Sequence, residues 1–171
     1  MRSGPGAGSM VAMVVVREVT LDDWETLRDV RLAALREAPS AFGSTYAREA
    51  AFTAEQWRGR INDRSVTYFA YLPENPEPAG LAGAYVNDGV ANVVSLWVRP
   101  SARGNGVGEA LIGATADWAR ARDHDSLVLW VTESNTSARS LYDRCGFALT
   151  GERQPLPSDP DLPEVRMRRP L

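Results

Sequence analysis

The chain contains no lysine. Its combined count of 19 lysines and arginines consists of arginines alone, and arginine stays charged in essentially any protein setting. No side-chain amine is therefore available as a nucleophile, a Schiff-base partner or a phosphate-binding cation. This absence excludes pyridoxal-phosphate enzymes and the NTPases that bind phosphate through a G-x-x-x-x-G-K-[ST] loop.

Cysteine and histidine are also scarce. The single cysteine, Cys145, excludes an intrachain disulfide framework and agrees with a reducing compartment. Cys145 stands where a helix is expected to end beside a glycine, which indicates a small packed side chain rather than a nucleophile. The single histidine, His124, has no partner at metal-ligand spacing, so we predict no metal site.

An excess of positive charge and long apolar runs are missing as well. The net charge of −3 does not favour nucleic-acid binding or a polybasic membrane surface. No apolar run is long enough to span a bilayer, and the first residues lack the apolar core of a signal peptide. The sequence therefore predicts a cytoplasmic protein that binds neither nucleic acid nor membranes.

Apolar periodicity indicates a single α/β domain. The chain has 171 residues, 44% of them hydrophobic, which suits one core. Residues 1–10 are rich in glycine, proline and serine and predict a flexible tail, so we expect the domain to occupy 11–171. Strands are expected over 13–18, 65–72, 79–87, 92–98, 126–131, 147–152 and 164–169. Helices are expected over 21–37, 54–64, 107–121 and 138–145.

Three details of this pattern concern the sheet. The run NVVSLWV, 92–98, is nearly unbroken in apolar residues and predicts a strand buried on both faces. Residues 155–163 are rich in proline and predict a loop. We expect the last strand, 164–169, to lie at a sheet edge, where it could pair across a two-fold axis in a homodimer.

The stretch RGNGVG, 103–108, joins a predicted strand to a predicted helix. Its three glycines, Gly104, Gly106 and Gly108, allow close backbone approach or a positive φ. The N-terminus of a helix binds phosphate, and Arg103 offers a charged fork for phosphate oxygens. A pyrophosphate site is therefore predicted, with a purely structural turn as the alternative. The dinucleotide fingerprint G-x-G-x-x-G does not fit, because its third glycine would come one residue later.

Two motifs resemble those of the GNAT acetyltransferase superfamily. Residues 98–108 resemble its R/Q-x-x-G-x-G/A loop, with Arg103, Gly106 and Gly108 at the fixed positions. Residues 135–147 resemble its second signature, N-x-x-A-x-x-L-Y-x-x-x-G-F. The resemblance covers nearly all of the chain and implies a single-domain fold. That fold has a central mixed, mostly antiparallel sheet of about seven strands flanked by four helices.

The resemblance implies an acyl-CoA-dependent N-acetyltransferase. Acetyl would pass directly from acetyl-CoA, the co-substrate, to a primary amine in a ternary complex. It also implies that the strand before the loop splays from its neighbour, and that the pantetheine arm lies between them. A backbone N–H near Val98 would polarise the thioester carbonyl. The implied cofactor-binding residues are Leu96, Trp97, Val98, Arg103, Gly104, Asn105, Gly106, Val107, Gly108 and Asn135. For Asn135, an ordinary helix N-cap is the alternative role.

The catalytic acid and base are less evident. Tyr142 lies on the inward stripe of its helix, where a phenol could protonate the leaving thiolate, or simply be a core tyrosine. An alkyl ammonium must lose a proton before it attacks, yet the strands over 92–98 and 126–131 carry no carboxylate. Glu133 is the nearest acid and is the candidate base. A solvated loop acid at Glu133, with deprotonation through water, is the alternative.

The acceptor site is implied by resemblance to involve the first two helices and their connection. Glu37, Tyr46 and Glu49 are the residues there that could contact an amine. A small metabolite, an antibiotic or a peptide amine would each fit, and the sequence does not rank them. A catalytically silent acyl-CoA-binding sensor or scaffold would show the same glycine loop and is the alternative function.

Overall fold

The computed structural model describes residues 13–171, so the tail expected over 1–10 lies outside the described residues. A seven-stranded sheet in the order β1-β2-β3-β4-β5-β7-β6 crosses the domain. All neighbouring strands are antiparallel except β4 and β5, which are parallel. The strands are β1 (Val15–Glu18), β2 (Ser65–Tyr71), β3 (Gly80–Asn87), β4 (Val90–Val98), β5 (Ser126–Thr132), β6 (Ala148–Leu156) and β7 (Asp159–Pro170).

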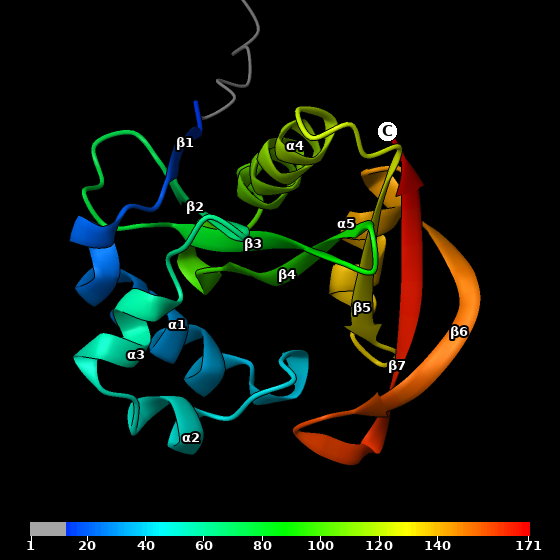
Figure 1. Cartoon of the computed structure of the whole chain (residues 1–171), viewed down its shortest axis with the longest axis horizontal. Coiled ribbons are helices and arrows are strands. Elements are labelled where there is room, and N and C mark those ends of the chain that lie inside the picture. Colours follow the sequence, from blue (N-terminus) through cyan, green and yellow to red (C-terminus); the bar gives the residue numbers. More distant parts are fainter. Residues whose placement is uncertain (1–12) are drawn as a thin grey trace, which may run out of the picture.

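Helices cover both faces of the sheet. In Figure 1, α1, α2 and α3 lie below the central strands and α4 lies above them. The four predicted helices are present, and a short helix, α2, is added where Thr45 caps the segment with its side chain. None of the described helices is long and apolar enough to cross a membrane. The helices are α1 (Trp24–Glu37), α2 (Tyr46–Ala50), α3 (Ala54–Gly59), α4 (Val107–Arg120) and α5 (Thr136–Arg144).

The core is divided by the sheet. On one side, Ile112 and Ala116 of α4 and Tyr142 of α5 pack on the strands. On the other side, the apolar stripe of α1 packs against Phe69 and Leu81. The first helix thus buries the face that its spacing predicts. The α3 segment ends five residues earlier than expected, because Asn62 turns back and its side-chain amide donates to the carbonyl of Gly59.

The strand β4 is not buried on both faces, which corrects the prediction for 92–98. Val94 is 43% exposed. The cause is a β-bulge: Gly83 pairs with Val94, but Leu81 pairs with Trp97, so β4 holds one extra residue. Ser95 in this bulge has a φ of 62°. The bulge interrupts the alternation of side chains and bends β4 next to β5.

The C-terminal residues form a long hairpin, so the predicted loop over 155–163 is wrong. Only 157 and 158 separate β6 from β7, and Pro155 pairs with Pro163 across the ladder. Proline is tolerated in this ladder because it lacks only the backbone N–H donor, and its backbone carbonyl can still accept a hydrogen bond. The strand β7 lies between β5 and β6, so it is not an edge strand. The expectation of a homodimer paired through this strand therefore loses its basis.

Candidate functional site

The parallel strands β4 and β5 separate after a very short contact. They pair only at Ala91 with Leu127 and at Asn92 with Val128. Beyond these pairs β4 continues to Val98 and β5 to Thr132, and Figure 1 shows the two strands running in different directions. The result is an opening between two strand edges whose backbone groups are left without a ladder partner.

The peptide of Val98 faces this opening. The backbone N–H of Arg99 donates to the carbonyl of Ala79 at 2.8 Å, so Arg99 is bonded to the β3 side. Because backbone groups along a strand alternate in direction, the N–H of Val98 points to the other side. This is the position at which the resemblance implies a backbone donor for the thioester carbonyl.

The glycine loop lies at the end of β4 and leads into α4. Gly104 and Gly106 have φ values of 81° and 79°, the left-handed region that favours glycine. An added Cβ at either position would meet nothing within 4 Å, so backbone conformation alone requires these glycines. Gly106 is the N-cap of α4 and has no side chain to bond the first amides of the helix. Those N–H groups are therefore available to an anion.

The third glycine of the loop has a different cause. Gly108 lies in the first turn of α4, and a Cβ there would come within 2.7 Å of the Leu141 side chain. Gly108 therefore allows α4 to pack closely on α5. Since Gly108 and Leu141 belong to the two separate motifs, this contact joins them in space.

Arg103 lies back along the end of β4. Its Nε donates to the Val98 carbonyl at 3.1 Å, and its Nη2 donates to Glu37 Oε2 at 3.0 Å. The same Glu37 oxygen accepts from Trp97 Nε1 at 2.9 Å. Through its Oε2 atom, the Glu37 carboxylate therefore connects the end of α1 to β4 and to the loop. Because Arg103 is half exposed, exchanging this ion pair for a phosphate would cost little.

Asn135 and Tyr142 occupy the two ends of α5. The Oδ1 atom of Asn135 accepts from the Ala138 N–H at 3.2 Å, which confirms the N-cap. That bond leaves the Nδ2 hydrogens for another acceptor. Tyr142 is buried and packs edge-on to Phe147. Burial raises the pKa of Tyr142 well above its ordinary value, so the phenol stays protonated at neutral pH and has a proton to donate.

Glu133, the candidate base, is bound to another group. Its carboxylate forms an ion pair with Arg153 of β6, and its carbonyl accepts from Arg139. A proton acceptor at this position would have to give up the pair with Arg153. The placement fits the alternative of a solvated loop acid better than a base.

A second feature of the site is a cavity of about 300 Å³ between the sheet and the first helices. We call it the arginine cavity. Leu27 and Arg31 of α1, Arg60 after α3, and Val94 and Ser95 of the β4 bulge line it, and β2 and β3 complete its wall. No carboxylate is among the residues that line it. It reaches the β4 bulge, beside the opening.

A buried ion triad supports this cavity. Glu49 is 1% exposed and accepts two hydrogen bonds from Arg31, both at 3.0 Å. It also accepts from Arg60 Nη1 at 2.8 Å. Burial raises the pKa of Glu49, but the hydrogen bonds from Arg31 and Arg60 outweigh it and lower the pKa to about 2. Glu49 therefore does not contact an amine, which corrects the expectation for it.

This triad predicts a loss of stability in acid. The pKa of Glu49 falls from 4.5 to about 2 on folding. The ionised carboxylate therefore contributes fully to the free energy of unfolding above pH 4.5, and this contribution is lost as the pH drops from 4.5 to about 2. Linkage makes the contribution about 3 kcal/mol. Urea unfolding at pH 7, 5, 4 and 3 should show it. The variant Glu49→Gln, less stable at pH 7, should lose less stability than the wild type over this interval. Parallel pH curves would contradict the assignment.

Sequence reasoning missed Arg31, Arg60 and Ser95. Arg31 follows Leu27 by four residues on the apolar stripe of α1, and an arginine on such a stripe is a signal of a buried partner. Nothing local marks Ser95, because the bulge comes from pairing with β3. Tyr46, the third residue expected near the acceptor, is outside the cavity, and its hydroxyl accepts from Arg36.

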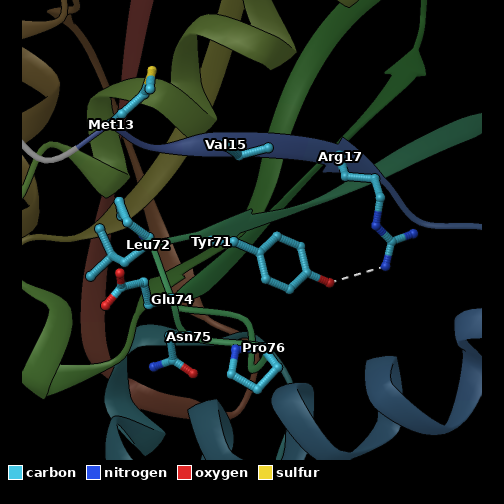
Figure 2. A pocket seen from close by; sticks show the side chains of 9 residues that line it. Met13, Val15, Arg17, Tyr71, Leu72, Glu74, Asn75 and Pro76 are labelled. Atoms are coloured by element: carbon cyan, nitrogen blue, oxygen red, sulfur yellow. Dashed lines mark hydrogen bonds between the residues drawn. The ribbon is translucent and has the colours of Figure 1, made fainter.

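Another hollow, of about 600 Å³, lies at the β1 edge of the sheet. Figure 2 shows Met13, Val15 and Arg17 of β1 and its approach facing the residues from Tyr71 to Pro76. Arg17 donates to the Tyr71 hydroxyl at 3.0 Å and pairs with Asp23. None of its lining residues belongs to β4, β5 or α4, so it is separate from the opening and we assign it no chemical role.

Comparisons with known proteins agree with this geometry. The model of the acetyltransferase (GNAT) family matches residues 27–147. A mycothiol acetyltransferase of Clavibacter sepedonicus is 30% identical over 153 residues, which are 85% of this chain and 46% of that protein. One of Salinispora tropica is 45% identical over 82 residues, 47% of this chain and 24% of that protein. The chain thus spans less than half the length of these relatives.

Solved structures share the fold over nearly the whole chain. An acetyltransferase of the GNAT family from Streptococcus pneumoniae superposes with a TM-score of 0.75 at 20% identity, over 93% of this chain and 99% of that one. A GCN5-related N-acetyltransferase from Kribbella flavida gives a TM-score of 0.69 at 27% identity, over 92% and 98%. These likenesses agree with the seven-stranded sheet predicted from the sequence.

Proposed function

The chain belongs to the GNAT family of acetyltransferases, and from this premise we propose that it transfers an acetyl group from acetyl-CoA to a primary amine. The observation that carries the proposal is the opening between β4 and β5, with the glycine loop and the free amides of α4 at its end. An extended amide-containing arm can bond to unpaired strand edges, and a pyrophosphate can bind at the helix N-terminus.

In this proposal the loop from Arg103 to Gly108 binds the pyrophosphate of acetyl-CoA. The backbone of Leu96, Trp97 and Val98 lines the pantetheine arm, and Asn135 Nδ2 donates to one of its carbonyls. The open space around Gly104 and Gly106 supports the fit, since no side chain occupies it. We also place the reaction in the cytoplasm, which the single cysteine supports.

The experiment that tests the proposal is calorimetric titration of the chain with acetyl-CoA, followed by turnover with a broad panel of amines. We expect micromolar binding that Arg103→Ala weakens about tenfold or more, since it removes one charge-assisted contact. Glu37→Gln is the matched control, because it breaks the same ion pair and keeps the arginine. Undetectable binding would overturn the proposal. Binding without turnover of any amine would favour the silent acyl-CoA-binding alternative.

Tyr142→Phe should lower the maximal rate at least about tenfold, because it removes the proposed donor to the leaving thiolate. The ring remains in its packing position against Phe147, so acetyl-CoA affinity should not change. Release of free thiol at saturating substrates measures the rate. Tyr68→Phe, at another tyrosine packed on the same core, is the control. A Tyr142→Phe rate equal to that of the wild type would exclude the acid role.

Deprotonation of the amine is assigned to water rather than to Glu133. The ion pair with Arg153 supports this choice. We therefore expect Glu133→Gln to change the rate less than about twofold and to leave its pH dependence in place. A large rate loss together with a shifted pH profile would instead identify Glu133 as the base.

A further inference from the structure

The arginine cavity has more positive than negative charge around it. Two guanidinium groups, those of Arg31 and Arg60, line it, and one carboxylate, that of Glu49, pairs with both. Glu49 is ionised at neutral pH, so it cancels one of the two charges. One full positive charge therefore remains beside a cavity whose lining residues include no acid.

Arg60 is the residue that can offer this charge to a ligand. The Arg31 side chain is 8% exposed and already bonds Glu49 twice and the Ser95 hydroxyl once. The Arg60 side chain is 37% exposed and makes two bonds to Glu49, at 2.8 and 3.4 Å. A guanidinium has five N–H donors, so three remain on Arg60.

The Arg60 guanidinium is also held in place. Its centre lies 5.2 Å from the Trp57 ring and 5.7 Å from the Phe52 ring. These contacts and the buried carboxylate fix its orientation before any ligand arrives, which reduces the entropy lost on binding. The hydroxyl groups of Ser65 and Thr67 line the same cavity and can add hydrogen bonds to an anion.

We propose that the acceptor amine carries an anionic group, a carboxylate or a phosphate, which Arg60 binds in the arginine cavity. This rests on the proposed acetyl transfer. The anionic group binds beside Arg60, and the amine then lies toward Ser95 at the β4 bulge, next to the opening. Specificity arises because a neutral analogue would leave the guanidinium unmatched.

The same charge helps to supply a neutral amine without a carboxylate base. A nearby positive charge disfavours the ammonium form. The acceptor's own anion stabilises its ammonium group in water. Once the anion pairs with Arg60, this stabilisation is weaker, and the pKa of the ammonium group falls. The amine nitrogen then attacks the acetyl carbonyl carbon; a C–N bond forms and the C–S bond breaks. The amine loses one proton to water, and the thiolate gains one from Tyr142, which water reprotonates.

Matched pairs of amines test the proposal. The pairs are β-alanine with β-alaninamide, L-methionine with L-methioninamide, and glucosamine 6-phosphate with glucosamine. We expect the charged member of at least one pair to have a kcat/KM at least about tenfold higher than its neutral partner, as a charge-assisted hydrogen bond would give. The first two pairs report a carboxylate and the third reports a phosphate.

Variants then assign the effect to Arg60. Arg60→Gln should lower kcat/KM for the preferred charged amine about tenfold to a hundredfold. For the neutral partner the loss should be several times smaller, because that amine loses only the effect of the positive charge on its ammonium form. Arg60→Lys should recover part of the loss, because it keeps the charge but not the planar fork. Arg58→Gln is the matched control, since this exposed arginine of α3 does not line the cavity.

The outcomes separate this inference from the function on which it rests. Equal rates for charged and neutral members, or an equal loss for both in Arg60→Gln, would overturn the anionic acceptor while leaving acetyl transfer in place. Acetyl-CoA binding without turnover of any member of the three pairs would also overturn it. A chain that does not bind acetyl-CoA would overturn the proposed function itself.

Discussion

Replacing Glu49 with alanine should lower the free energy of unfolding by about 3–5 kcal/mol, the cost of breaking a buried ion pair by removing one partner. The variant would leave Arg31, which is 6% exposed, without its carboxylate in the interior. It would also release Arg60 from its two bonds to Glu49. Because native domains are stable by only about 5–15 kcal/mol, this loss would bring the chain close to unfolding at room temperature.

Urea unfolding at pH 7, followed by tryptophan fluorescence, measures this loss. Glu55→Ala is the matched control: Glu55 lies in α3 and is exposed, so its replacement should change stability by less than about 0.5 kcal/mol. Glu49→Gln should fall between the two, because the amide keeps one acceptor for the guanidinium groups. A loss below about 1 kcal/mol for Glu49→Ala would show that the triad contributes little to the fold.

The double variant Gly104→Ala and Gly106→Ala should weaken acetyl-CoA binding by roughly thirtyfold to several hundredfold. Each glycine has a φ near 80°, and a residue with a Cβ loses about 1–2 kcal/mol there. The loop lies at the surface, so without ligand it can relax to another conformation. Binding of acetyl-CoA must then return the loop to the strained conformation, and the free energy that this requires is lost from the binding affinity.

Calorimetric titration with acetyl-CoA measures this loss, and Gly113 provides the control. Gly113 lies inside α4, where an added Cβ meets nothing within 4 Å and φ is not positive. Gly113→Ala should keep full affinity and raise stability by up to about 1 kcal/mol. If the double variant bound acetyl-CoA as tightly as Gly113→Ala, the glycine loop would not be the pyrophosphate site.

Several parts of the fold could be predicted because their causes are local. The strand preceding the loop, the glycines with positive φ and the amphipathic helix after them involve residues within a few positions of one another. The same holds for the N-cap at Asn135 and the capping box at Thr53. Two motifs in the right order then identified the family, and the family implied the splayed strands that the structure contains.

Other parts depend on partners distant in the chain. The residues over 155–163 look like a loop, yet they form strands because the end of β6 and the start of β7 pair with each other. The composition of a segment does not reveal which strands will lie beside it. The bulge at Ser95 likewise exists only relative to β3, and it exposes Val94 in a strand whose sequence favours full burial.

The sequence by itself determined the family, the strand–loop–helix unit and the glycine positions of the proposed cofactor site, because backbone conformation and helix periodicity are set by near neighbours. Only the tertiary structure decided what the acceptor side is made of. Glu49 bonds to Arg31, 18 residues away in the chain, and to Arg60, 11 residues away. An acid that the sequence places in a connecting segment is thus the buried centre of an ion triad. Charge balance in a cavity is a property of distant residues brought together, so it becomes visible only when the chain is folded.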